Sequence, residues 1–382
     1  MRVCHVSPHL PPDQGANALL PAQLGRWSSK HGIDVTFVSL PPAQGGRATD
    51  DLAGPVHRVP ARSTSALARI TRFDTLLRAK AITRALDVAA ADADVLHLHS
   101  NGLIVEVAAA WAKRRGRPCV LTLYGTEIWH YRPRWPIDPF TRAYRQATAV
   151  AFYSQGLLTR ARELGLDRAG LEVVYPAVSA QFVRVDDATR HRYRAELGIR
   201  EPHVILNVKR LHELAGQRYL IDAFATIART REDVRLVICG TGPLRADLEG
   251  QARTLGVAEH VTFAGLVPND RVARYAAAAD VFALPSLLEA LPTVAVEALA
   301  SGTPVVSADH PGGEELHGLF EDDVAVVPKQ DVKALAQALE THLDGPRRTR
   351  PATADIVARR FSPEAVIDAY HRLYEQACPT PA

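Results

Sequence analysis

The chain has 382 residues and a formal net charge of only +3 at pH 7; 47% of its residues are hydrophobic and 23% charged, as in ordinary globular proteins of one or two domains. No apolar run approaches the roughly 20 residues that cross a bilayer, and the Pro-rich start MRVCHVSPHLPP lacks the apolar length of a signal peptide, so we expect a cytoplasmic protein. The four cysteines lie far apart and form no CxxC pair, which argues against a disulfide framework or a zinc site.

Short β-branched runs alternate with longer stretches of helical periodicity along the whole chain. The first half holds six such runs, at 2–7, 34–40, 94–100, 119–124, 149–154 and 171–176. The second half holds six more, at 204–209, 234–240, 260–266, 280–286, 304–309 and 324–329. Nearly continuous apolar runs are typical of parallel strands covered on both faces. The pattern predicts an α/β protein made of two Rossmann-like doubly wound domains that face each other across a cleft.

The domain limits follow from the same pattern. We expect an N-terminal domain at 1–183, a C-terminal domain at 184–360, and a C-terminal helix at 361–382 that packs back toward the N-terminal domain. The polar stretch 183–202 is interpreted as the linker region. In such sheets ligands bind beyond the carboxyl ends of the strands, so loops at those ends are the places to look for chemistry.

Charge is distributed unevenly between the halves. Residues 1–180 carry a net charge of +8, and residues 181–382 carry −5. A basic segment at 61–90 combines six cations with an apolar stripe of helical spacing: Arg62, Arg69, Arg72, Arg78, Lys80 and Arg84, with Leu67, Ile70, Phe73 and Leu77. Three interpretations stay open: residues 62–84 dock on an anionic membrane, attract an anionic acceptor, or pack on their own domain.

Two glutamates stand out in the apolar stretch SLLEALPTVAVEALASGTPVV. Glu289 is expected in the loop after the strand at 280–286, and Glu297 on a helix that has Pro292 in its first turn and ends at Gly302. A carboxylate accepts two hydroxyl hydrogen bonds at once, as vicinal sugar hydroxyls offer, and a helix N-terminus suits a phosphate. Spacing alone fits an exposed loop glutamate and a helix-surface glutamate better than a site.

The surrounding segments change that balance. ILNVKRLHELAGQRYLIDAF, LVICGTGPLRADLE, the run from VTFAGL to VVSAD, and HPGGEEL stand in the order and spacing of one family. The chain resembles the retaining family-4 glycosyltransferases of the two-domain GT-B fold over nearly its whole length. The resemblance implies transfer of a glucose- or N-acetylglucosamine-type unit from a UDP-sugar to an acceptor hydroxyl, by same-face attack.

The resemblance also implies how the domains share the reaction. The C-terminal domain would bind the donor, and the N-terminal domain would bind a small-molecule or lipid-linked glycan acceptor. No metal, cofactor or nucleic acid is expected. The carboxylates at 91–95 precede a strand, at the end away from the expected cleft, and those at 321–323 lie in a polar turn, so neither group is expected to hold an ion. An acceptor in a lipid layer would place the protein on the inner membrane surface.

Individual roles follow the family's motifs. The catalytic residues would be Glu289 on donor-hexose hydroxyls, Arg210 on the diphosphate, and Tyr124. Glu297 would bind the ribose of the donor. Further donor contacts are expected from a wider set: Gly15, Lys209, Gly240, Gly242, Leu291, Pro292 and Thr293. Acceptor contacts are expected from His99, Glu127 and Trp129.

Three positions depart from the family. Ala215 stands where a phosphate-binding lysine is usual, which Lys209 or His212 would have to replace. Tyr124 stands where a histidine is usual, and Ala16 where a glycine is common. Two alternatives stay open. A nucleotide-sugar epimerase of related fold would share the two domains and the diphosphate site, and the departures at Ala215 and Tyr124 leave open a non-catalytic nucleotide-sugar-binding protein.

The segment VLHLHS brings two histidines close together in the sequence. We expect one of His97 and His99 to face the core and the other the opposite side, with His99 nearer the strand end.

Overall fold

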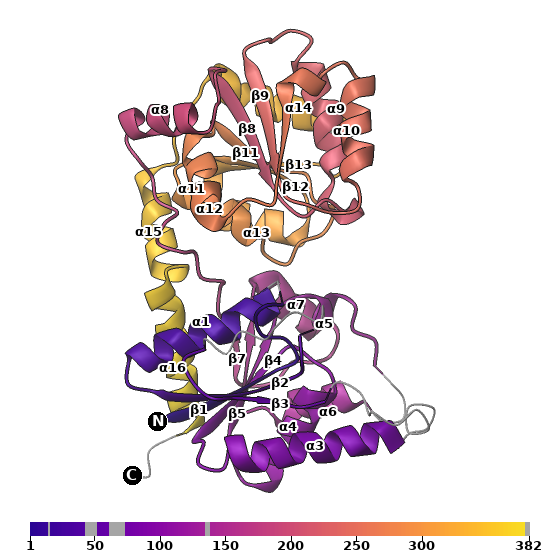
Figure 1. Cartoon of the computed structure of the whole chain (residues 1–382), viewed down its shortest axis with the longest axis vertical. Helices are drawn as coiled ribbons and strands as arrows, with labels where there is room; N and C mark the ends of the chain where they lie inside the picture. Colours follow the sequence, from indigo (N-terminus) through magenta and orange to yellow (C-terminus); the bar gives the residue numbers. More distant parts are fainter. Residues whose placement is uncertain (14–15, 43–51, 61–72, 134–137, 379–382) are drawn as a thin grey trace. The chain divides into compact units, whose positions relative to one another are not determined.

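The computed structural model describes residues 1–13, 16–42, 52–60, 73–133 and 138–378. The chain divides into two compact units, Met1–Tyr175 with Val366–Ala382, and Pro176–Ala365 (Figure 1). The sequence placed these limits at 183/184 and 360/361. Below they are called unit 1 and unit 2.

Unit 1 is built on a parallel sheet in the order β3-β2-β1-β4-β5-β6-β7. The strands are β1 (Arg2–Ser7), β2 (Asp34–Ser39), β3 (Val56–Arg58), β4 (Val95–His99), β5 (Cys119–Leu123), β6 (Ala149–Phe152) and β7 (Leu171–Val173). The six predicted strands are all present. The sequence analysis missed β3, because this edge strand has only three residues, all half-buried, and so gives no apolar run.

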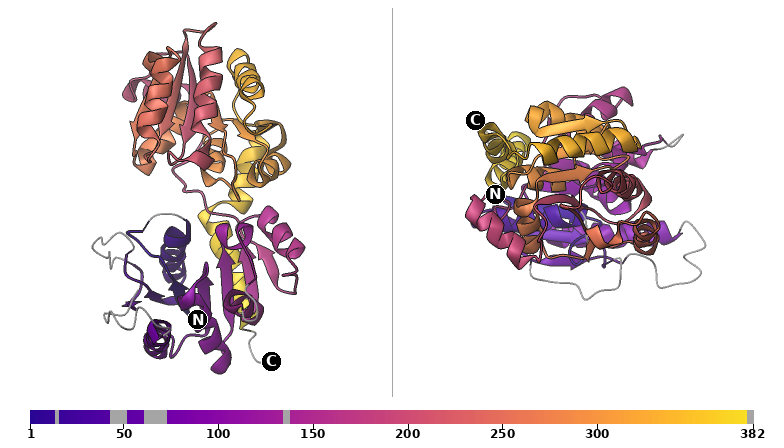
Figure 2. Two further views of the ribbon diagram at one scale, coloured as in Figure 1. Left: turned by 90° about the vertical axis from the view of Figure 1, so that its right-hand side faces the viewer. Right: turned by 90° about the horizontal axis from the view of Figure 1, so that it is seen from above.

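Helices cover both faces of this sheet (Figures 1 and 2). They are α1 (Ala16–Lys30), α3 (Phe73–Ala89), α4 (Leu103–Arg114), α5 (Thr126–Trp129), α6 (Pro139–Gln146), α7 (Gln155–Glu163) and most of α16 (Pro363–Ala377). Helix α16 joins the unit through hydrogen bonds, since Tyr374 Oη lies 2.7 Å from His97 Nδ1 and Tyr370 Oη 3.2 Å from Thr122 Oγ1.

Unit 2 has a second parallel sheet in the order β10-β9-β8-β11-β12-β13. Its strands are β8 (His203–Val208), β9 (Val234–Cys239), β10 (Val261–Gly265), β11 (Val281–Leu284), β12 (Val305–Ala308) and β13 (Val324–Val327). Each matches a predicted run to within three residues. Two parallel sheets with helices on both faces confirm the predicted fold class.

The helices of unit 2 also form two layers. Helices α9 (Gln217–Ile227), α10 (Arg245–Thr254) and α14 (Val332–Asp344) pack together over one face, and α11 (Asn269–Ala278) and α12 (Thr293–Ala300) cover the other. Helix α8 (Asp187–Glu196) packs on α11. The unit also contains α13 (Pro311–Phe320), α15 (Pro351–Arg360) and three 3-10 turns, η1 (Glu213–Ala215), η2 (Ala258–His260) and η3 (Glu321–Asp323).

The interpretation of 183–202 as a linker is wrong. Helix α8 lies in this stretch, and its Arg190 and Arg194 pair with Asp280, whose side chain is 3% exposed at the start of β11. The Asp280 carboxylate also accepts a hydrogen bond from Val204 N at 2.7 Å. The polar composition that looked like a linker therefore serves a buried ion-pair network inside unit 2.

Among the residues described, none of the helices combines the length and the apolar character needed to cross a bilayer.

Candidate functional site

The carboxyl ends of β8 and β11 bring a charged pair together in unit 2. Lys209 follows β8, Glu289 lies in the loop after β11, and Lys209 Nζ is 2.6 Å from Glu289 Oε1. The two side chains are 21% and 17% exposed, so the pair is partly shielded from water. Lys209 is therefore the cation that accompanies Glu289, while Ala215, at the family's lysine position, is fully buried.

The loop that carries Glu289 is held by the start of α13. Gly312 N donates to the backbone oxygen of Glu289 at 3.1 Å, and a side chain at Gly312 would come within 2.9 Å of the Ala290 oxygen. His310 caps the same helix, because its Nδ1 accepts from Gly313 N at 2.9 Å. Burial lowers the pKa of His310 to about 4, so the ring is neutral and can accept. Gly312 thus holds the loop that carries Glu289 against the start of α13.

Glu297 is the fifth residue of α12 and is half-buried. In the part of the chain that the structure describes, its carboxylate has no hydrogen-bond partner. Burial raises the pKa of Glu297 to about 7. Because it has no partner, the ionised carboxylate can accept hydrogen bonds from the hydroxyl groups of a ligand.

The start of α12 has no side-chain cap. Pro292 is its N-cap residue rather than part of its first turn as expected, and it follows the buried Leu291. The helix begins at Thr293, which is half-buried. Backbone N–H groups at such an end favour an anion.

Arg210 projects from the loop after β8, and its side chain is exposed. Its backbone oxygen accepts from Gln217 Nε2 at 3.2 Å, and Gln217 is buried at the start of α9. Close backbone packing explains why glycine stands at positions 240 and 242. A Cβ at either position would overlap the backbone oxygen of Lys209 or of Leu211, so both glycines let the loop after β9 lie against the loop after β8.

The expected residues of unit 1 gather after β4 and β5. Tyr124 is half-exposed, and its Oη lies 2.8 Å from His99 Nδ1. Glu127 is 5% exposed; its carboxylate accepts from Ser100 Oγ and from Gly125 N at 2.9 Å. Glu127 therefore joins two loops.

The other two acceptor candidates differ in exposure. His99 is fully buried, so it reaches a ligand only through Tyr124. Trp129 is half-buried, and its Nε1 is buried without a partner among the described residues.

Unit 2 contains a cavity of about 460 Å³, and unit 1 contains one of about 670 Å³. The unit 1 cavity lies beyond β4 and β5 and is lined by groups of both charges, including Arg78, Asn101, Glu127, His130 and Arg132. The sequence analysis did not single out Asn101, His130 or Arg132 for a site, although all three follow predicted strands. Gly15, Arg62, Arg69 and Arg72 lie outside the described residues.

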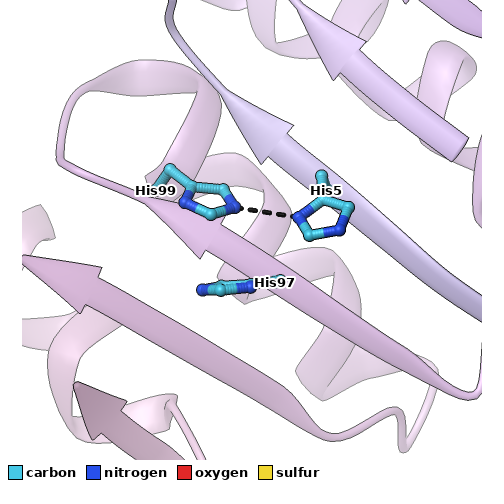
Figure 3. A group of neighbouring side chains, drawn as sticks. All are labelled: His5, His97 and His99. Carbon is cyan, nitrogen blue, oxygen red and sulfur yellow. Dashed lines mark hydrogen bonds between the residues drawn. The ribbon is translucent and has the colours of Figure 1, made fainter. Parts of the chain in front are cut away.

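His97 and His99 do not face opposite sides as expected. Residues two apart on a strand point to the same face, and the ring centroids of the two histidines are only 3.9 Å apart. His5 of β1 joins them, with its ring centroid 5.3 Å from each (Figure 3). The sequence analysis did not recognise His5, whose pairing with His97 depends on β1 and β4 being neighbours.

Two family profiles match the chain. The profile of glycosyl transferases group 1 matches residues 189–356, and that of a glycosyl transferase 4-like domain matches residues 20–177.

Three curated relatives are similar to this chain. A D-inositol 3-phosphate glycosyltransferase of Acidothermus cellulolyticus is 32% identical over 343 residues, which cover 81% of this chain and 74% of the relative. A 2-deoxystreptamine glucosyltransferase of Streptomyces kanamyceticus is 27% identical, covering 86% and 87%. A GDP-mannose-dependent alpha-(1-6)-phosphatidylinositol monomannoside mannosyltransferase of Mycolicibacterium smegmatis is 34% identical, covering 62% and 64%.

Solved structures share the fold. A sucrose-phosphate synthase of Thermosynechococcus elongatus superposes with a TM-score of 0.76 at 22% identity, covering 98% of both chains. The Anabaena protein HepE, solved in complex with UDP, superposes with a TM-score of 0.77 at 18% identity, covering 97% of this chain and 99% of HepE. The likeness extends over both units and confirms the GT-B fold. The profiles and the Acidothermus relative together place this chain in the group 1 glycosyltransferases, and it is a glycosyltransferase.

Proposed function

We propose that the chain is a retaining glycosyltransferase that moves a glucose- or N-acetylglucosamine-type unit from a UDP-sugar to an acceptor hydroxyl. The observation that carries this proposal is the set of groups at one edge of the unit 2 sheet. There the Lys209–Glu289 pair, the partnerless carboxylate of Glu297, the exposed Arg210 and the uncapped start of α12 come from neighbouring loops.

Each group suits one part of a nucleotide sugar. The Glu297 carboxylate accepts both ribose hydroxyls, which removes the cost of leaving a half-buried carboxylate unpaired. The diphosphate lies at the N–H groups of α12, with the planar Arg210 guanidinium on its oxygens. Glu289 accepts from hexose hydroxyls, and Lys209 holds its carboxylate in place.

The chemical step breaks the bond between the hexose anomeric carbon and the diphosphate oxygen. The acceptor oxygen forms a bond to that carbon from the same face, and its proton passes to the departing diphosphate. Cations and N–H groups aimed at the leaving oxygens stabilise the charge that develops there. The Glu127 carboxylate joins two loops by accepting from Ser100 Oγ and the Gly125 N–H, and so serves a structural role in unit 1. We therefore favour same-face attack without a covalent intermediate. We expect neither metal nor cofactor to be required.

The acceptor is assigned to unit 1, at the cavity that follows β4 and β5. Arg78, His130 and Arg132 offer cations or donors there, and Glu127 lies in its wall. These groups suit a polyhydroxylated acceptor that carries a negative charge, either a small molecule or a lipid-linked glycan.

A lipid acceptor would bring α3 to an anionic membrane. The described part of the predicted basic segment exposes Leu76 and Leu77, at 64% and 50%, together with Lys80 and Arg84. Apolar side chains next to cations are the features that hold a helix at a lipid surface.

Radiolabelled UDP-glucose, UDP-N-acetylglucosamine and GDP-mannose, each with and without candidate acceptors, test the proposal. GDP-mannose is included because of the Mycolicibacterium relative. Acceptor-dependent release of UDP with an axial linkage in the product supports it. Transfer only from GDP-mannose overturns the UDP assignment, and an equatorial linkage overturns retention. Interconversion of the sugars without an acceptor supports an epimerase, and binding without turnover supports a non-catalytic protein.

A further inference from the structure

Three side chains of unit 1 form a row of hydrogen bonds that leads from the buried strands β1 and β4 to Tyr124 after β5. His5 Nδ1 lies 3.0 Å from His99 Nε2 (Figure 3). On its other side, His99 Nδ1 lies 2.8 Å from Tyr124 Oη. His5 and His99 are both 0% exposed, whereas Tyr124 is half-exposed beyond the end of β5. This row of hydrogen bonds therefore connects the core of unit 1 with the sheet edge where the loops of the acceptor cavity begin.

Both histidines are neutral in the folded unit. Burial lowers the pKa of His5 to about 3 and that of His99 well below its ordinary value. A neutral imidazole has one N–H and one bare nitrogen, so His99 donates to one of its two neighbours and accepts from the other. Hydrogen-bond donation along His5, His99 and Tyr124 can accordingly run in either direction. Tyr124 keeps its O–H for a ligand only when His99 donates to it.

The second nitrogen of His5 selects the direction. His5 Nε2 is buried and has no hydrogen-bond partner among the described residues. If it carried the proton, the core would hold an orphaned N–H, which is rarer in proteins than an acceptor with an unused lone pair. The proton therefore belongs on Nδ1, which donates to His99 Nε2. His99 then donates from Nδ1 to Tyr124 Oη.

We infer that His5 and His99 are positioning residues, which fix Tyr124 as a hydrogen-bond donor toward the bound substrate. The inference rests on the proposed function, since Tyr124 stands where the family has a polar active-site histidine. Among the described residues, the Tyr124 hydroxyl has only His99 as a partner, and burial raises the pKa of Tyr124 well above its ordinary value, so the hydroxyl keeps its proton.

A metal ion is the competing explanation for three clustered histidines. One nitrogen from each of His5, His97 and His99 lies within 4.8 Å of the others. However, His97 already uses both nitrogens, with Tyr374 Oη and Thr122 Oγ1 at 2.7 Å each. Its ring also lies over that of His99, tilted by 31°, so their in-plane lone pairs do not converge on one point. The contacts favour a hydrogen-bonded array.

Nitrogen-15 NMR of the histidine side chains in the full chain tests the direction without any activity. The expected result is a proton on Nδ1 of both His5 and His99, with His5 Nε2 bare; resonances are assigned from His5→Phe and His99→Phe. The opposite tautomers overturn the inference. So does one equivalent of zinc per chain by elemental analysis that is lost in His5→Phe.

A double-mutant cycle tests the link to catalysis with the active donor. Tyr124→Phe and His99→Phe should each lower kcat by about 2- to 10-fold, the loss of one ordinary hydrogen bond. The double variant should be no slower than Tyr124→Phe alone. His99→Asn, which keeps an N–H near the place of Nδ1, should recover most of the rate. Independent, multiplicative losses overturn the inference.

His97→Phe is the matched control, because it removes a ring from the same stack that does not touch Tyr124. The factor by which His97→Phe lowers kcat should multiply with the factor for Tyr124→Phe. Melting curves show that each variant is folded. If the wild-type chain transfers no sugar from any donor, the proposed function fails, and the tautomers still decide the inference.

Discussion

Glu297 provides the sharpest test of the donor site, because its ionisation should change when a nucleotide sugar binds. Burial raises the pKa of its carboxyl from the ordinary 4.5 to about 7 in the empty site. One pKa unit corresponds to about 1.4 kcal/mol, so keeping this carboxylate ionised in the empty site costs about 3 kcal/mol. Two ribose hydroxyls donate to the ionised form and should bring the pKa back toward its ordinary range.

Binding at Glu297 should therefore release a proton. With a pKa of about 7 before binding, the expected release is about 0.9 proton per site at pH 6, about 0.5 at pH 7 and about 0.1 at pH 8. Calorimetry in buffers of different ionisation enthalpy measures this number. UDP-glucose is the suitable probe, because neither of its phosphates titrates near neutral pH. GDP-mannose serves equally if the donor is a GDP-sugar.

Glu297→Gln is the matched control, since it keeps the shape of the side chain and cannot ionise. It should bind the donor more weakly and release no proton at any of the three pH values. A wild-type chain that binds the donor with no proton release, or a release that persists in Glu297→Gln, would refute the ribose assignment.

Four further predictions concern the donor loop, Gly313, the buried histidines and α3. Glu289→Gln should lower kcat by about 10- to 100-fold, because it removes a charged partner worth about 1.5–3 kcal/mol; steady-state rates close to wild type contradict the assignment. Gly313→Ala should destabilise unit 2 by about 1–3 kcal/mol, since its Cβ would overlap the Ala308 oxygen. Gly318→Ala on the same helix meets nothing within 4 Å and should stabilise it slightly, so equal shifts in melting temperature count against this reading. The depressed pKa of His5 means that the unfolded chain takes up a proton between pH 6.5 and about 3 that the folded unit does not. The stability of unit 1 should therefore be full above pH 6.5 and fall as the pH drops, and His5→Phe should flatten that fall by up to about 1.4 kcal/mol per pH unit. Urea titrations followed by tryptophan fluorescence measure the free energy of unfolding of unit 1, since all four tryptophans belong to residues 1–175. If that free energy falls with pH equally steeply in His5→Phe, the role given to His5 is wrong. Lys80→Gln with Arg84→Gln should weaken binding to anionic vesicles roughly 30-fold at low salt, at about 1 kcal/mol per cation, whereas Lys113→Gln with Arg114→Gln should not; a wild-type chain that stays in the supernatant rules out the membrane contact.

The sequence predicted the parts of this protein that leave a local pattern. Twelve of the strands give apolar runs, and the loop and helix that carry Glu289 and Glu297 give turn and cap signals at Pro292 and Gly302. Strand β3 was missed because three half-buried residues at a sheet edge form no run.

Features that depend on neighbours far apart in the sequence could not be predicted. The stretch 183–202 looked like a linker because its arginines are polar, but their partner Asp280 lies about 90 residues further along. His5 and His99 meet only because β1 and β4 are neighbours in the sheet, and 94 residues separate them in the chain. The cap of His310 on Gly313 was local and could have been noticed from the HPGG sequence.

A crystal structure of the chain soaked with a UDP-sugar would show the donor site itself. The nucleotide should lie at the carboxyl edge of the unit 2 sheet. Glu297 should accept both ribose hydroxyls, the diphosphate should lie at the start of α12 and at Arg210, and Glu289 should lie on the hexose. A nucleotide bound instead in the 460 Å³ cavity lined by Arg218, Asp222 and Gln251 would contradict this placement of the donor.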